Sequence, residues 1–167
     1  MTTIRPLTEV ADFQKCLELQ RDTWGMADVD LLPSRIYLVQ TLIGGLVLGA
    51  FEGDRLIGFL NAMPGIREGK PYWHSLTMAV HPDYWNCGIG SMLKLTQRDA
   101  ARQRGIKLIQ WTYDPLQSKN AYLNVRKLGA VIRKYHQNLY GATTSALFHG
   151  LDTDRVIAEW WVEQPRI

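Results

Sequence analysis

The stretch TMAVHPDYWNCGIGSMLKLTQRDAARQRGIKLIQWT, residues 77–112, contains the features that decide the fold of this chain. It starts as an apolar strand that Pro82 closes, because proline cannot donate to a central β ladder. A Gly-x-Gly pair then precedes residues 89–104, where apolar side chains recur at helical spacing. A further glycine suits a left-handed helix end, and residues 106–113 are again apolar. The pattern predicts a strand, a glycine turn, a helix and a second strand.

Gly88 and Gly90 stand where the chain leaves the strand and enters the helix, and three phosphate-binding interpretations compete for this turn. A Walker loop ends in Gly-Lys-Ser/Thr, which the turn lacks. A dinucleotide fingerprint needs a third glycine at position 93, where the chain has Leu93. The third is an anion site, in which backbone N–H groups of Asn86 to Gly90 and the helix dipole hold a pyrophosphate. The alternative to all three is an ordinary strand-to-helix turn.

The residues on either side extend this unit to an α/β arrangement. The expected order, strand-helix-helix-strand-strand-strand-helix-strand-helix-strand-strand, alternates only in its middle, which indicates a mixed sheet rather than a doubly wound one. The full length of 167 residues suits one domain with a real core. Outside the central unit, the expected elements are a strand at 2–7, helices at 9–24 and 33–43, strands at 46–52 and 55–63 around a Gly-Asp turn, a strand at 72–80, a helix at 118–129, and strands at 130–141 and 154–162.

The bulk composition excludes several classes of protein. A net charge of +3 is too mild for the dense basic face of a nucleic-acid-binding protein. The longest apolar run, residues 36–51, is interrupted and falls short of the ~18 residues of a membrane span. The N-terminus has no apolar signal core. Cys16 and Cys87 lie far apart without metal-ligand spacing, which favours reduced thiols, a cytoplasmic location and no metal.

On the residues quoted above, the chain resembles motif A of the GNAT superfamily of N-acetyltransferases. It shares the strand, a V-x-P closure, an aromatic at Tyr84, the Gly-x-Gly turn, and a helix ending in RGI before the next strand. The C-terminal run 111–141 is similar to a bacterial GNAT group with largely unassigned substrates. The resemblance implies a single α/β (α+β) domain over residues 1–167, with a mostly antiparallel sheet of six to seven strands, about four flanking helices and splayed central strands.

The resemblance also implies a function: transfer of an acetyl (acyl) group from acetyl-CoA to an acceptor, expected to be a small-molecule amine, by direct attack on the thioester. Amides of the turn would bind the pyrophosphate, the strand would pair with the pantetheine arm, and Lys94 and Arg98 could meet the 3′-phosphate. No metal is implied. The residues expected to bind coenzyme A are Met78, Ala79, Val80, Trp85, Asn86, Cys87, Gly88, Ile89, Gly90, Ser91, Asn120 and Asn124.

The chain departs from the family pattern at two places. Trp85 stands where the turn usually has Gln or Arg, and Val125 stands where many members have the tyrosine that protonates the leaving thiolate. Tyr122 is the nearest phenol and the candidate for this catalytic role, although it faces another direction on a regular helix. A general acid contributes ~10²–10⁴-fold to a rate, so its loss slows catalysis without abolishing it. The alternative function is therefore a coenzyme A-binding regulatory or sensor module with weak or no catalysis.

Three side chains are candidates for handling the proton or the ammonium of the acceptor. His74 has a suitable pKa for a base and shares the parity of Met78 on its strand, although it could be an ordinary strand histidine. Asp114 could anchor an ammonium, or form an Asx turn before the next helix. Glu159 could be a buried functional carboxylate, but an acid on an edge strand is the better interpretation. The terminal hairpin, which ends in two tryptophans, could pair with a second copy as a homodimer.

Overall fold

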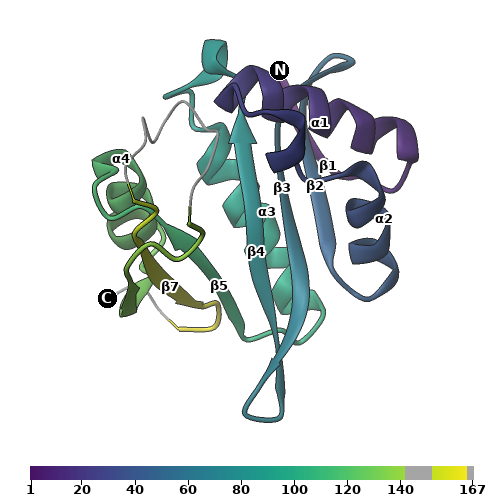
Figure 1. Ribbon diagram of the computed structural model, residues 1–167. Coiled ribbons are helices and arrows are strands. Elements are labelled where there is room, and N and C mark those ends of the chain that lie inside the picture. The colour runs from purple at the N-terminus through teal and green to yellow at the C-terminus, as the bar shows by residue number, and fades with distance from the viewer. Residues whose placement is uncertain (142–151, 165–167) are drawn as a thin grey trace.

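A computed structural model of the chain describes residues 1–141 and 152–164 (Figure 1). Helices and strands follow one another in the order predicted from the sequence. The short helical turns are η1 (Asp28–Asp30), η2 (Pro82–Tyr84) and the π-helical η3 (Tyr122–Lys127). The longer elements are β1 (Thr2–Pro6), α1 (Val10–Trp24), α2 (Ser34–Leu42), β2 (Leu46–Glu52), β3 (Arg55–Arg67), β4 (Lys70–Val80), α3 (Ile89–Gln103), β5 (Leu108–Tyr113), α4 (Ser118–Ala121), β6 (Val131–His136) and β7 (Arg155–Trp161).

The strands form one seven-stranded sheet in the order β1-β2-β3-β4-β5-β7-β6. Every neighbouring pair is antiparallel except β4 and β5. Those two strands run parallel and pair only at Trp73 with Ile109 and at His74 with Gln110. Beyond these residues they diverge toward their C-terminal ends (Figure 1). The predicted mixed, mostly antiparallel sheet with splayed central strands is confirmed.

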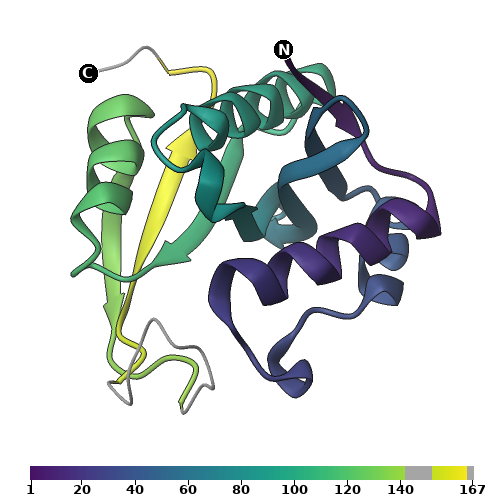
Figure 2. The ribbon, with the colours of Figure 1, turned by 90° about the horizontal axis from the view of Figure 1, so that it is seen from above.

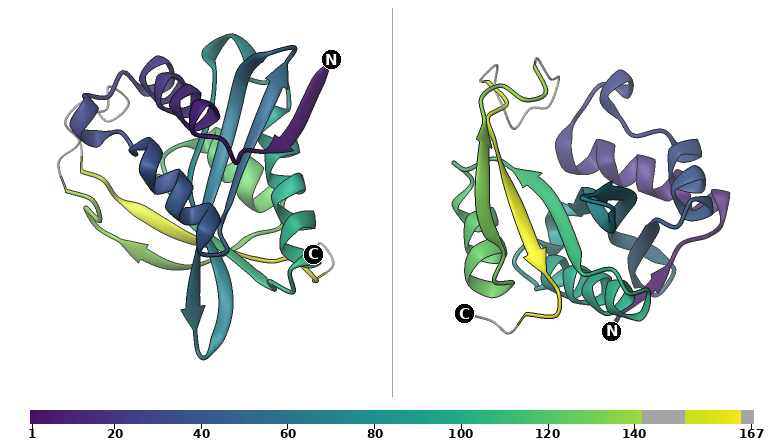
Figure 3. Two further views of the ribbon diagram at one scale, coloured as in Figure 1. Left: turned by 90° about the vertical axis from the view of Figure 1, so that its right-hand side faces the viewer. Right: turned by 90° about the horizontal axis from the view of Figure 1, so that it is seen from below.

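The helices cover the two faces of the sheet. Phe13 of α1 and Tyr37 of α2 belong to a core cluster with Phe59 of β3 on one face. Ile89 and Leu93 of α3 belong to a second, larger cluster on the other face. Figure 3 shows the sheet between α1 and α2 on one side and α3 on the other. Burial of these apolar side chains on both faces holds the diverging strands in place.

The buried stripes of the long helices differ from the sequence prediction. Val10 shares the helical spacing of the apolar residues Phe13 and Leu17 in α1, which predicts a place in the core, yet it is 61% exposed. In α3 the expected apolar face included Met92, which is 40% exposed, whereas the polar side chains Lys94 and Gln97 are buried. The cause is the divergence of β4 and β5, which leaves space beneath this part of α3. Polar groups line that space, and periodicity of apolar residues cannot detect them.

A β-bulge in β4 reverses one prediction about the candidate site. At Leu76, β4 has one residue more than β3 opposite it. An extra residue shifts every later side chain to the other face of a sheet. Ser75 and Met78 therefore both lie on the α3 face, where Ser75 bonds a side chain of α3 and Met78 packs against the α3 cluster. His74 lies on the opposite face, so the expected shared face with Met78 is wrong.

The C-terminal strand is not an edge strand, contrary to the expectation. β7 pairs with β5 on one side and with β6 on the other. Trp160 is 5% exposed, in edge-to-face contact with Trp111. With both of its edges paired, β7 cannot add to a sheet of a second copy. The homodimer stays a prediction.

Two further features concern the described residues alone. None of the helices in residues 1–141 and 152–164 has the length and apolar character needed to cross a bilayer. Within the same ranges, no cluster of three or more His, Cys, Asp or Glu side chains could hold a metal ion. Both thiols are free, with Cys16 buried and Cys87 exposed.

Candidate functional site

A pocket of about 570 Å³ occupies the gap between the diverging strands. Its walls come from the end of α1 and the following loop on one side, and from β5, α4 and the C-terminal hairpin on the other. Figure 2 shows these two halves facing each other. β4 and α3 supply the side chains between the two walls. The residues that the argument below uses are Ser75 and Met78 of β4, Lys94 of α3, Trp111 of β5, Asp114, Asn120 and Asn124.

The glycine turn brings unpaired backbone N–H groups together at the start of α3. Asn86 and Gly88 adopt positive φ angles of 65° and 83°. The Cys87 amide donates to the Tyr84 carbonyl over a long 3.4 Å. Among the described residues, no acceptor pairs with the amides of Asn86, Gly88, Ile89, Gly90 or Ser91. Five free donors at the positive end of a fifteen-residue helix form a site for an anion.

The two glycines have different reasons to be glycine. Gly88 is in the left-handed region at the N-cap, where a side chain costs roughly 1–2 kcal/mol. Gly90 has no such angle, and a Cβ there would meet Met78 at an ordinary 3.5 Å. Folding alone therefore does not require glycine at position 90. The missing side chain leaves space beside Met78, a residue that lines the pocket.

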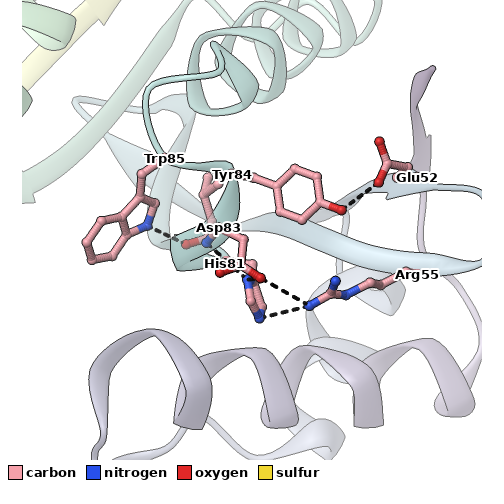
Figure 4. Close-up of polar contacts among 7 residues, drawn as sticks. Glu52, Arg55, His81, Asp83, Tyr84 and Trp85 are labelled. Carbon is pink, nitrogen blue, oxygen red and sulfur yellow. Dashed lines mark hydrogen bonds and ion pairs between the residues drawn. The ribbon is translucent and has the colours of Figure 1, made fainter.

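Side chains outside the turn attach it to the sheet (Figure 4). The Asp83 amide donates to His81 Nδ1 at 3.3 Å, and Arg55 lies 3.0 Å from His81 Nε2. The Tyr84 hydroxyl donates to Glu52 at 2.5 Å. Glu52 and Arg55 flank the β2–β3 turn, so this hairpin carries the segment that leads into the glycine turn. Arg55 lies 26 residues before His81 in the chain, so this contact depends on the pairing of β3 with β4.

Trp85 occupies one of the expected cofactor contacts. Its indole N–H donates to the Val80 carbonyl at 2.7 Å, while 48% of the residue stays exposed (Figure 4). That carbonyl was expected to face a pantetheine arm. Trp85 thus occupies the backbone acceptor at the end of the unpaired edge of β4. The backbone polar groups around Met78 and Ala79 come next along β4.

Lys94 is the feature that the sequence analysis placed wrongly. It was expected at a solvent-exposed phosphate, but the residue is 2% exposed. Its ammonium donates to Ser75 Oγ at 2.9 Å and to Gln97 Oε1 at 3.2 Å, and lies 3.8 Å from the Trp111 ring centroid. Burial lowers the pKa of the amine to about 7. Lys94 also lines the pocket, so this titratable group is placed to contact a ligand that binds there.

His74 has the chemical character expected of a base but lies apart from the pocket. Burial, and secondly the nearby Lys94 charge, lower the pKa of its imidazole below the usual 6.5. The imidazole is therefore neutral and able to accept a proton at neutral pH. It is absent from the described lining of the pocket, which begins on β4 at Ser75.

Asp114 and Tyr122 have different positions. Asp114 lines the pocket, and its Oδ1 accepts from the Leu116 amide at 2.8 Å, which is the Asx turn foreseen as the alternative. Tyr122 is 58% exposed, with Lys127 over its ring at 5.6 Å. Its side chain points to solvent, outside the described lining of the pocket, and a catalytic role for Tyr122 stays a prediction. Of His74, Asp114 and Tyr122, only Asp114 belongs to that lining.

The helix after β5 contains Val125, the position of the missing family tyrosine. Residues 122–127 form a π-helix, and the Leu128 amide bonds the Leu123 carbonyl five residues back. A wider turn rotates the side chains relative to an α-helix. Val125 is consequently 48% exposed, while Asn124 is 4% exposed and lines the pocket. Asn120 lines it as well, so both predicted amides reach the pocket.

Glu159 is buried for a structural reason. Its carboxylate accepts from Arg67 at 2.6 Å and from Arg133 at 3.1 Å, and its side chain is 3% exposed. Burial opposes its ionisation, but the two arginines outweigh it and the pKa falls below the usual 4.5. The carboxylate joins β3, β6 and β7, and it is neither an edge-strand acid nor part of the pocket lining described above.

Comparisons with known proteins agree with this geometry. The family model described as acetyltransferase (GNAT) family matches residues 13–129. Among curated protein sequences, none matches the chain significantly.

Several solved structures share the fold at low sequence identity. The ribosomal-protein-S18-alanine N-acetyltransferase of Escherichia coli has a TM-score of 0.73 and 16% identity, covering 99% of this chain and 96% of its own. The yncA protein of Salmonella typhimurium, solved with its cofactor acetyl-CoA, has 0.73 and 17%, covering 99% and 96%. The PaiA N-acetyltransferase of Thermoplasma acidophilum, solved with coenzyme A, has 0.68 and 18%, covering 96% and 99%. At these identities the likeness shows a common fold.

Proposed function

Because this chain belongs to the acetyltransferase (GNAT) family, we propose that it transfers an acetyl (acyl) group from acetyl-CoA to a small-molecule amine. Acetyl-CoA supplies the acyl group as a thioester. The amine attacks the carbonyl carbon, a C–N bond forms and the C–S bond breaks. The proton lost by the amine ends on the released thiolate. Residues 1–167 carry this activity as one domain. The free thiols support our further proposal of a cytoplasmic location.

The unpaired amides of the glycine turn are the observation that carries this proposal. The N–H groups of Asn86 and of residues 88–91 have no acceptor among the described residues, and the negative oxygens of a pyrophosphate would accept hydrogen bonds from them. Glycine at position 90 keeps the path from this anion site into the pocket open beside Met78. A helix dipole and backbone amides bind such an anion without a cationic side chain.

The free part of β4 suits the pantetheine arm. β5 leaves β4 after His74, so the backbone of β4 between Ser75 and Val80 has no strand on that side. An extended arm could add there like a strand, next to Met78 and Ala79. Asn120 and Asn124 line the same pocket and offer amide groups to the arm or the sulfur.

The proton of the attacking amine requires an acceptor. We propose His74 for this role, since its lowered pKa leaves the imidazole neutral at pH 7. Because His74 lies outside the described lining of the pocket, it would act through a relay of water molecules past the neighbouring Ser75. Asp114 is the group in the pocket that would hold the ammonium before its proton leaves.

A regulatory coenzyme A-binding module is the second candidate function. The observation that favours it is the exposed Val125 at the position of the family tyrosine. A loss of the general acid slows turnover but leaves the cofactor site intact. The two functions share the cofactor site and differ in turnover.

Thermal unfolding with acetyl-CoA tests cofactor binding, which both functions need. A concentration 100 times the dissociation constant should raise the free energy of unfolding by about 2.7 kcal/mol and the midpoint by about 5–10 °C. Gly88→Val should abolish the shift, because it removes the left-handed turn that presents the amides. Gly69→Val is the matched control, since Gly69 has a φ of 74° in the β3–β4 turn, away from the residues that hold the glycine turn.

No shift with millimolar acetyl-CoA would reject both functions, and an equal shift in Gly88→Val would reject the anion site. Thiol release across a panel of small amines then separates the two functions. Turnover with any of them supports the transferase, whereas binding without turnover supports the regulatory module.

A further inference from the structure

The ammonium of Lys94 lacks a negative partner. No ion pair joins it to a carboxylate in the described parts of the chain, and burial alone lowers its pKa. Its neighbours are a hydroxyl, an amide oxygen and an indole ring. Buried charges in proteins are normally paired, because removing a charge from water costs several kcal/mol. The position therefore calls for a negative group from outside the chain.

The number of donors on the ammonium leads to the same expectation. An ammonium has three N–H donors, and Ser75 and Gln97 accept two of them. The aromatic face of Trp111 stabilises the charge without accepting a full hydrogen bond. One donor is left, on a side chain that lines the pocket.

Its place in the sheet indicates which part of a ligand it meets. β4 and β5 separate immediately after His74, and Lys94 contacts the next residue, Ser75. An arm that enters at the glycine turn and follows β4 runs from Val80 toward Ser75. Whatever is attached at the end of that arm points toward the closed end of the gap, where the ammonium lies.

We propose that Lys94 is the counter-charge for a carboxylate at the far end of the acyl group, so that the preferred donor is the coenzyme A thioester of a dicarboxylic acid. This inference rests on the proposed function. The carboxylate accepts the remaining N–H of Lys94, and the pair is shielded from water by Trp111 and β4. A carboxylate on the acceptor has the same chemistry, and the experiment below distinguishes the two sources.

The preference depends on pH through Lys94. The amine is charged below pH 7 and increasingly neutral above it, so the attraction for a carboxylate is greatest below pH 7 and weakens toward pH 9. Other ionisable groups nearby are His74, and Asp30, Asp114 and Arg155 in the pocket lining. Lys94 is the group of this set whose pKa of about 7 lies at the start of that range, and we assign the change to its amine.

Isothermal titration calorimetry with succinyl-CoA and butyryl-CoA tests the proposal, because the two acyl chains have nearly the same length and differ in the carboxylate. At pH 6.5 the full chain should bind succinyl-CoA roughly ten- to a hundredfold more tightly. The ratio should fall as the pH is raised to 9. Lys94→Met should remove the preference, so that the variant binds succinyl-CoA and butyryl-CoA with equal affinity. Lys107→Met is the control, since Lys107 is an exposed lysine paired with Glu163.

Equal affinities for the two thioesters, or a preference that survives in Lys94→Met, would overturn the proposal. The proposal would also be overturned if Lys94 gave a preference for acceptor amines that carry a carboxylate over amines without one, while the chain bound all acyl donors equally. Failure of every thioester to bind would reject the proposed function together with this inference. Binding of acetyl- and butyryl-CoA without a succinyl preference would reject this inference alone.

Discussion

Lys94 and Glu159 are the most deeply buried charged residues that the structure describes, each 2% exposed, and their surroundings are opposite. Glu159 lies where β3, β6 and β7 meet and accepts from two arginines. Lys94 lies at the closed end of the pocket and contacts only neutral groups. A buried charge with fixed partners of opposite sign holds strands together. A buried charge without one is a cost that the fold bears for another purpose.

The largest effect should come from breaking the paired site. Glu159→Gln leaves the two arginines without their common carboxylate, and we expect the free energy of unfolding to fall by about 2–3 kcal/mol, since both arginines keep some access to water. Urea unfolding measures this. Glu163→Gln is the control, an exposed partner of Lys107 that should change stability by less than about 0.5 kcal/mol.

The loss in Glu159→Gln should also depend on pH with a known sign. The folded-state pKa of Glu159 lies below its usual 4.5, so its stabilisation is complete above that value and disappears as the pH falls through the lower folded-state pKa. The difference between the two proteins should therefore shrink in acid. A difference that grew in acid would contradict the ion-pair assignment.

Removing the unpaired charge of Lys94 should raise the free energy of unfolding, whereas Glu159→Gln lowers it, and the change should be smaller. Lys94→Met keeps the length of the side chain, and we expect it to stabilise the chain by about 1–2 kcal/mol below pH 7. The folded-state pKa of about 7 lies below the usual 10.5, so the wild type regains stability as the pH rises from 7 to 10. Urea unfolding of the wild type and of Lys94→Met at pH 6 and at pH 10 measures this, and the two proteins should differ less at pH 10. Destabilisation at pH 6 would show that Lys94 is paired like Glu159.

The smallest effect concerns His74, which senses the Lys94 charge. The ammonium is the second cause, after burial, of the lowered imidazole pKa. Lys94→Met should therefore raise the pKa of His74 toward its usual 6.5, as a proton NMR titration of the imidazole would show. An unchanged titration would mean that Lys94 is already neutral or too distant to act.

Much of the fold was predictable because its signals are local. The order of helices and strands followed from apolar periodicity and from glycine and proline positions, and Gly88 and Gly105 adopt the positive φ angles that their places suggested. The free amides of the turn are likewise a property of a short segment. The free amides of residues 86–91 could therefore be foreseen from the sequence, and their binding of a pyrophosphate stays a prediction.

The side chains of the pocket were predicted less well, because their orientation depends on partners elsewhere in the chain. The bulge at Leu76 arises from pairing with β3, and it moves His74 away from the face of Met78. In the π-helix, the side chain that lines the pocket is Asn124, and Val125 is not part of the lining. Regular strand and helix periods contain neither irregularity.

The sequence by itself determined the order of helices and strands and the glycine turn with its free amides, since single residues such as glycine and proline restrict φ and hydrogen bonding wherever they stand. Only the tertiary structure decided that one lysine of a basic-looking helix is buried without a counter-charge. That outcome requires β4 and β5 to separate above α3, with Ser75 and Trp111 from the two strands meeting the same ammonium. The environment of a charge is a sum over residues distant in sequence, and no local pattern records it.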